Sequence, residues 1–194
     1  MNDRRVRAGG VFAFICALAS VGAASARPNA APGTDASALE ATPCTAVSAR
    51  LPDNVRMHRD LLPRVRVMLR RSPTFRRQCH RLAEAPWVHV AVGIDPAFND
   101  HRRFRAMSVI QRPNPALLLA VVTVQALADP AMWVAHEFEH ILEQMERVNL
   151  TELAEKRKAV WRTSEDVFET ARAVRAGEAV LAEVRGDDDH NFVD

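Results

Sequence analysis

Residues 136–140 of the 194-residue chain read His-Glu-Phe-Glu-His, with a glutamate directly after the first of two histidines. Residues four positions apart lie one turn apart on a helix face, so His136 and His140 can bind one metal ion. Glu137 flanks that face and can reach a water molecule beside the metal. Zinc would lower the pKa of this water, and Glu137 would take its proton during attack on a carbonyl. Chance alone gives about 0.015 such matches in a chain of this composition, so we interpret the motif as functional.

The residues around the motif predict a helix that presents it. Asp129 is a good N-cap and Pro130 suits the first helical position, so we expect a helix from there to about Val148. Val134, Phe138 and Ile141 fall on one side of this helix, opposite the two histidines. The pattern predicts a helix buried on one face that presents its ligands to a cleft on the other.

This arrangement resembles the zincin metallopeptidases, in which a substrate-edge strand precedes an HExxH helix and a third ligand follows. The resemblance covers about Trp87 to Arg185 and implies that Leu117–Val124 is the edge strand. Position 146 is a glutamate, so the third histidine of the metzincin branch is missing, and the gluzincin branch fits better. The resemblance implies a minimal gluzincin core with a zinc cofactor and a peptide or protein substrate.

In gluzincins the third ligand is a glutamate on the next long helix. We expect that helix to start at Thr163 or Ser164 and to end near Arg185. Glu169 is the preferred ligand because it would lie firmly inside the helix. Glu165 is the alternative, in which case Glu169 would hydrogen-bond a ligand histidine instead.

Four further positions bear on the site. Glu143 and Arg172 are candidates to orient a ligand or to bind the substrate. Glu139 stands where the family usually has an uncharged residue, and we expect it to face solvent. Trp161 is expected to pack in the core, and the alternative is that it lines the cleft. The chain has no tyrosine, so the phenol that often stabilises the oxyanion in gluzincins has no counterpart here.

The N-terminus reads as a secretory signal peptide over residues 1–26. A basic start precedes the apolar stretch Val11–Ala24, and Ala24-Ser25-Ala26 matches a cleavage site. An uncleaved membrane anchor is the alternative. We therefore expect a secreted or periplasmic protein with a flexible leader at 27–43, one zincin-like domain at 44–185 and an acidic tail at 186–194. No stable membrane span is expected after cleavage.

The net charge depends on this signal. The whole chain carries a formal charge of +2, but residues 1–26 hold three arginines and Asp3, so the remainder is neutral. A neutral domain argues against nucleic acid and anionic membrane surfaces as partners. Cys44 and Cys79 remain after cleavage, and an even count in an exported chain predicts one disulfide. Two free buried thiols are the alternative.

The overall pattern predicts an α+β fold. Residues 54–85 read as helical, with breaks near Pro63 and at Ser72-Pro73. Three β-like segments follow, and we expect them to form a small, mostly antiparallel or mixed sheet; they are Trp87–Val92, Arg105–Gln111 and Ala116–Val124. The last of these is nearly all apolar, so it is expected to be buried on both faces. Leu150–Trp161 reads as a short polar helix or loop between the two site helices.

The sequence thus predicts an exported zinc-dependent metallohydrolase, a small peptidase with Glu137 as general base. The alternative is a zinc-binding structural or scaffold protein without turnover. Glu137 and His140 also match one ligand pair of a di-iron helical bundle, but that fold needs a second such pair, which the sequence lacks.

Overall fold

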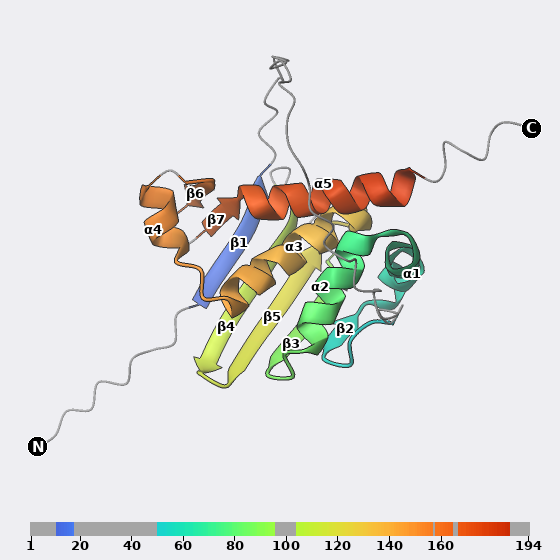
Figure 1. Ribbon diagram of the computed structural model, residues 1–194, viewed down its shortest axis with the longest axis horizontal. Coiled ribbons are helices and arrows are strands. Elements are labelled where there is room, and N and C mark those ends of the chain that lie inside the picture. Colours follow the sequence, from blue (N-terminus) through green and yellow to red (C-terminus); the bar gives the residue numbers. More distant parts are fainter. Residues whose placement is uncertain (1–10, 18–49, 96–103, 157, 165–166, 187–194) are drawn as a thin grey trace, which may run out of the picture.

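The computed structural model describes residues 11–17, 50–95, 104–156, 158–164 and 167–186. The fold is α+β, as expected from the sequence, with helices packed over one face of a mixed sheet (Figure 1). The other face of the sheet is open, because alternate residues of β5 such as Leu119 and Val121 are exposed. The expectation that this segment is buried on both faces is therefore wrong. No helix in the described ranges is long and apolar enough to cross a membrane.

The main sheet contains more strands than the three that the sequence suggested. Its mixed four-stranded part has the order β2-β3-β5-β4, and β1 extends it by pairing with β4. The strands are β1 (Val11–Ala17), β2 (Val55–Met57), β3 (Val88–Ile94), β4 (Phe104–Asn114) and β5 (Leu117–Val124). β3 runs parallel to both β2 and β5, whereas β4 runs antiparallel to β5 and to β1. Because β5 is paired on both sides, it cannot be the edge strand that the zincin resemblance implied.

The described helices are η1 (Arg59–Leu61), α1 (Leu62–Arg71), α2 (Pro73–Ala83), α3 (Pro130–Met145), α4 (Leu150–Glu155) and α5 (Ala171–Arg185). Except for α1, they begin after a residue whose side chain caps them. The Ser72 hydroxyl accepts a hydrogen bond from the Phe75 amide, and the Asp129 carboxylate accepts one from the Ala131 amide. These bonds satisfy amides that a helix start would otherwise leave unpaired. The predicted start of α3 is thereby confirmed, and the helical stretch expected over 54–85 proves to begin with strand β2.

The last helix starts later than predicted. Residues Val160–Ser164 and Val167–Thr170 form β6 and β7, a two-stranded antiparallel sheet, and α5 begins only at Ala171. Val160 and Phe168 are buried in this hairpin, and cross-strand packing of such side chains outweighs the helical pattern. Glu169 therefore lies on a strand and not inside a helix, which corrects the reason for preferring it.

The N-terminal expectations are tested only in part. Val11–Ala17, the first half of the apolar stretch assigned to the signal, forms β1. The proposed cleavage site and the leader at 27–43 lie outside the described residues, as do Cys44 and residues 187–194 of the tail. Cys79 is buried, and burial raises the pKa of its thiol to about 12. Its pairing with Cys44 stays a prediction.

Helix α5 crosses α3 at close range, and Gly177 permits this approach (Figure 1). A Cβ atom at this position would lie 2.8 Å from the Met132 carbonyl oxygen and 3.3 Å from His136 Cβ. The first distance is too short for any real contact, so a larger residue would push α5 away from the helix that carries the motif. The sequence gives no sign of this role of Gly177, since a glycine inside a helix carries no chemical signal of its own.

We expect Gly177→Ala to lower the free energy of unfolding by about 1–2 kcal/mol. The clash costs about 1–3 kcal/mol, and the better helix propensity of alanine returns up to about 1 kcal/mol of that. Urea denaturation followed by circular dichroism measures the difference. Gly93→Ala is the control, since nothing lies within 4 Å of a Cβ built there, and its stability should change by less than about 0.5 kcal/mol. Equal stability of both variants would contradict this account of the helix contact.

Candidate metal centre

The two histidines of the motif lie on α3, the most buried helix among the described elements. Every residue from Trp133 to Glu143 is buried, and His136 and His140 are at most 1% exposed. The sheet lies on one side of α3 and α5 on the other (Figure 1). The expected helix with one face open to a cleft is therefore wrong, because α5 covers the side that carries the histidines.

Glu169 reaches the two histidines from β7, just before the first residue of α5. Its Oε1 lies 3.2 Å from His136 Nε2 and 3.6 Å from His140 Nε2. The two Nε2 atoms are 3.1 Å apart. The Thr170 amide donates a hydrogen bond to the same Glu169 oxygen, which fixes the carboxylate at the strand–helix junction. The structure thus brings together the three residues preferred from the sequence, and Glu165 lies outside the described residues.

These three atoms fit a bound metal ion. Ligand atoms at 2.0–2.1 Å from a tetrahedral ion are roughly 3.3–3.4 Å apart, close to all three distances found here. Two imidazoles and one carboxylate also match the donor set of a three-ligand catalytic zinc site. The group His136, His140 and Glu169 could therefore hold a metal ion.

The charges around the site favour a cation at its centre. Burial disfavours the charged form of His140, but hydrogen bonds to Glu143 and Glu169 and the nearby Glu137 charge outweigh it and raise its pKa to about 10. Burial likewise opposes ionisation of Glu169, yet the two histidines hold the pKa of its carboxyl group far below the usual range. Without a metal, the positive charge at the centre of this cluster is a proton on His140. A bound divalent cation would supply that positive charge instead.

Glu143 contacts His140, as its predicted role of orienting a ligand histidine would require. Its Oε2 lies 3.1 Å from His140 Nδ1, and its Oε1 accepts a hydrogen bond of 2.8 Å from the Thr170 hydroxyl. A carboxylate on the far ring nitrogen fixes the tautomer that leaves Nε2 free to bind a metal. Glu143 is 3% exposed, and its role in substrate binding stays a prediction.

Thr170 links these elements and was missed by the sequence analysis. Besides binding Glu143, its hydroxyl accepts a hydrogen bond from the Ala173 amide and so caps α5. One side chain therefore joins the start of α5 to the carboxylate that orients His140. The signal was present in the sequence, because a threonine before an alanine-rich helical segment is a typical N-cap.

We expect Glu143→Gln to weaken metal binding by about 10- to 100-fold. The amide keeps the size of the side chain but removes the negative charge that supports His140. Competition with a chromophoric zinc chelator measures the affinity. Glu178→Gln, the same change at an exposed position of α5, should leave the affinity unaltered. Equal affinities for both variants would remove Glu143 from the site.

Glu137, the predicted general base, is completely buried on α3. Its charge contributes to the raised pKa of His140, which places its carboxylate close to the ligand set. Burial near a cationic centre is an environment in which a carboxylate can accept a proton from a water molecule held there. The structure is therefore compatible with the assigned role of Glu137.

Arg172 forms ion pairs with carboxylates at the helix contact, and its predicted role toward substrate stays a prediction. Its guanidinium group pairs with Glu139 and Glu146 and so ties the start of α5 to α3. The Glu139 carboxylate, expected to face solvent, is buried and also accepts a hydrogen bond of 2.8 Å from Gln78 on α2. The charged residue that departs from the zincin pattern thus holds three helices together.

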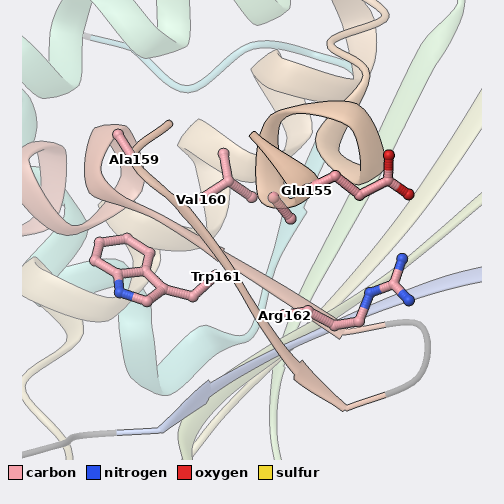
Figure 2. Close-up of a pocket in the computed structure, with 6 residues that line it drawn as sticks. Glu155, Ala159, Val160, Trp161 and Arg162 are labelled. Atoms are coloured by element: carbon pink, nitrogen blue, oxygen red, sulfur yellow. The ribbon is translucent and has the colours of Figure 1, made fainter. Parts of the chain in front are cut away.

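A pocket of about 700 Å³ lies beside the hairpin that carries Glu169 (Figure 2). It is lined by Ala154, Glu155, Ala159, Val160, Trp161 and Arg162. Trp161 is 51% exposed, so the expectation that it packs in the core is wrong. It stands directly opposite Glu169 in the β6–β7 pairing, and opposite residues of an antiparallel pair share one face.

Comparisons of the chain with protein-family models, with curated proteins and with solved structures find no match in any of the three.

Proposed function

We propose that the protein is a zinc-dependent hydrolase that cleaves peptide bonds. The observation that carries the proposal is the convergence of His136, His140 and Glu169 beside the buried Glu137. The donor set matches catalytic zinc sites, and the spacing of the motif matches the metallopeptidase pattern of two ligands and a base. The resemblance to the gluzincin branch supports the same assignment, with Glu169 as the third ligand.

Each residue then has a defined task. His136, His140 and Glu169 would hold the zinc ion, which when bound supplies a Lewis acid that polarises the scissile carbonyl and lowers the pKa of water. Glu143 keeps the proton of His140 on Nδ1, so that Nε2 stays available as a ligand. Glu137 accepts the proton of the attacking water on its carboxylate and passes it to the departing amine.

An exported location fits this proposal. The apolar stretch that follows a basic start supports a signal peptide, and a secreted or periplasmic hydrolase would meet peptides there. The substrate would be a peptide or protein.

A second candidate function is a structural metal site without turnover. The burial of both histidines and of Glu137 favours it, because structural zinc sites are closed whereas catalytic sites keep one position open. In the described structure Glu169 is the most accessible of the three ligands, with 13% of its side chain exposed.

Digestion of a peptide library by the purified chain, after residues 1–26 have been removed, tests the enzyme proposal. Products are identified by mass spectrometry with added zinc and, in parallel, with a chelator present. We expect cleavage that depends on zinc and disappears with the chelator. A fully zinc-loaded and folded chain that cleaves no library peptide would support the structural alternative.

A further inference from the structure

Strand β1 fills a slot at the edge of the sheet, beside the candidate metal centre. It pairs antiparallel with β4, in a register that places Phe12 opposite Ile110 and Phe14 opposite Ser108. On its other side β1 lies next to β7 (Figure 1). The segment is thus held between a strand of the main sheet and the strand that carries Glu169.

The elements around this slot are those that carry the site. β7 holds Glu169, and β4 packs against α3, on which His136 and His140 lie. Any extended chain in the place of β1 would therefore run alongside the elements that position the candidate ligands.

Without β1, β4 would have an open edge. Among the described strands, β4 pairs with β5 on one side and with β1 on the other. It is 11 residues long, and an exposed edge of this length offers a row of amides and carbonyls that an added strand can pair with. The predicted cleavage after Ala26 would separate β1 from the rest of the chain.

The side chains of β4 indicate which peptides would fit. Ala106, Ser108 and Ile110 alternate along the strand and are each at most 2% exposed, so they face the core. In the register of β1, Phe12 is the partner position of Ile110 and Phe14 that of Ser108. Small and apolar side chains at the edge of β4 suit an extended peptide with large apolar residues at alternate positions.

We propose that the slot between β4 and β7 is a binding site for extended apolar peptides, and that residues 11–17 occupy it in the uncleaved chain. The bound peptide adds a strand to β4 by main-chain hydrogen bonds, with its alternate residues selected by the core-facing side of β4. This inference rests on the proposed function where it identifies the bound peptide as substrate. The binding step itself needs no metal.

The test uses the full-length chain with a protease recognition sequence inserted within residues 27–43. A fluorescent peptide of residues 11–17, with serine in place of Cys16, is titrated before and after cutting and removal of the N-terminal fragment. Fluorescence anisotropy is measured with a chelator present. We expect saturable binding only after the cut, with an affinity at least tenfold above that of the uncut chain.

A control peptide with proline at the position of Phe14 separates strand pairing from general apolar adhesion, because proline cannot donate to the ladder. It should bind at least tenfold more weakly. A photoreactive group at the same position of the original peptide should crosslink to β4 near Ser108.

Three results would each overturn the proposal. They are equal binding before and after the cut, equal binding of the proline peptide, and unfolding of the chain once the fragment is removed. Because the titration contains no metal, its failure does not affect the zinc proposal. A chain that binds the peptide but cleaves none would support the binding site and contradict the proposed hydrolase activity.

Discussion

Glu137→Gln is expected to abolish peptide hydrolysis, with a loss of kcat of about 10³-fold, while the zinc content stays at the wild-type level. Glutamine keeps the size of the buried side chain but cannot accept the proton of the attacking water. General base catalysis contributes about 10²- to 10⁴-fold, so the expected loss lies within that range. Single-turnover cleavage of a library-derived peptide, with zinc measured on the same sample, checks both halves of the result.

Glu178→Gln serves as the matched control, since Glu178 is exposed on α5 and has no assigned part in the site. It should retain full activity and full zinc content. If the Glu137 variant keeps its activity, the base is another group. If it loses zinc together with activity, Glu137 supports the metal centre and its role as base is wrong.

His140→Ala is expected to remove bound zinc and to destabilise the fold. It deletes one ligand and leaves Glu143 and Glu169 facing each other across a buried space without the imidazole between them. Breaking a buried charged pair by removing one partner costs about 3–5 kcal/mol, so a large fall in the unfolding midpoint should accompany the loss of metal. Zinc content and urea denaturation are measured on the same preparation.

His89→Ala is the control for the loss of a histidine, since His89 is exposed on the open face of the sheet. Its zinc content should equal that of the wild type. Glu169→Gln complements the test, because it preserves the size of the side chain and should still lower zinc affinity by removing the charged ligand. Retention of one equivalent of zinc by the His140 variant would exclude the assigned centre.

The sequence was most informative where the chemistry is local. His136, Glu137 and His140 are fixed relative to one another by the helix period alone, and Asp129 with Pro130 marks where that helix starts. The three β-like segments also correspond to β3, β4 and β5. Within these stretches, short-range pattern and structure agree because neighbouring residues decide the outcome.

Features that depend on distant contacts were not predictable in the same way. Glu169 was preferred as the third ligand on the assumption of a helix, but the pairing of β6 with β7 overrode that helical pattern. Its carboxylate nevertheless lies beside the two histidines. Glu139 was expected in solvent because nothing in its neighbourhood reveals Arg172 and Gln78, which come from other helices. The contact at Gly177 likewise depends on how α5 crosses α3.

The position of β5 shows the limit most clearly. Its apolar sequence indicates a strand, but whether that strand lies at the edge or the centre is decided by β3 and β4, which pair with it on either side. Whether a strand lies at the edge of its sheet depends on the order of all the strands, and the sequence of one strand does not determine that order. In the described sheet the outer strands are instead β1 and β2.

The most direct test of the central claim is X-ray absorption spectroscopy of the purified full-length chain, with the metal content measured on the same sample. The account predicts one zinc ion per chain, bound by two imidazole nitrogens and a carboxylate oxygen, with the carboxylate signal lost in Glu169→Gln. A chain that contains no zinc and acquires none on addition, or a zinc spectrum that Glu169→Gln leaves unchanged, would contradict it.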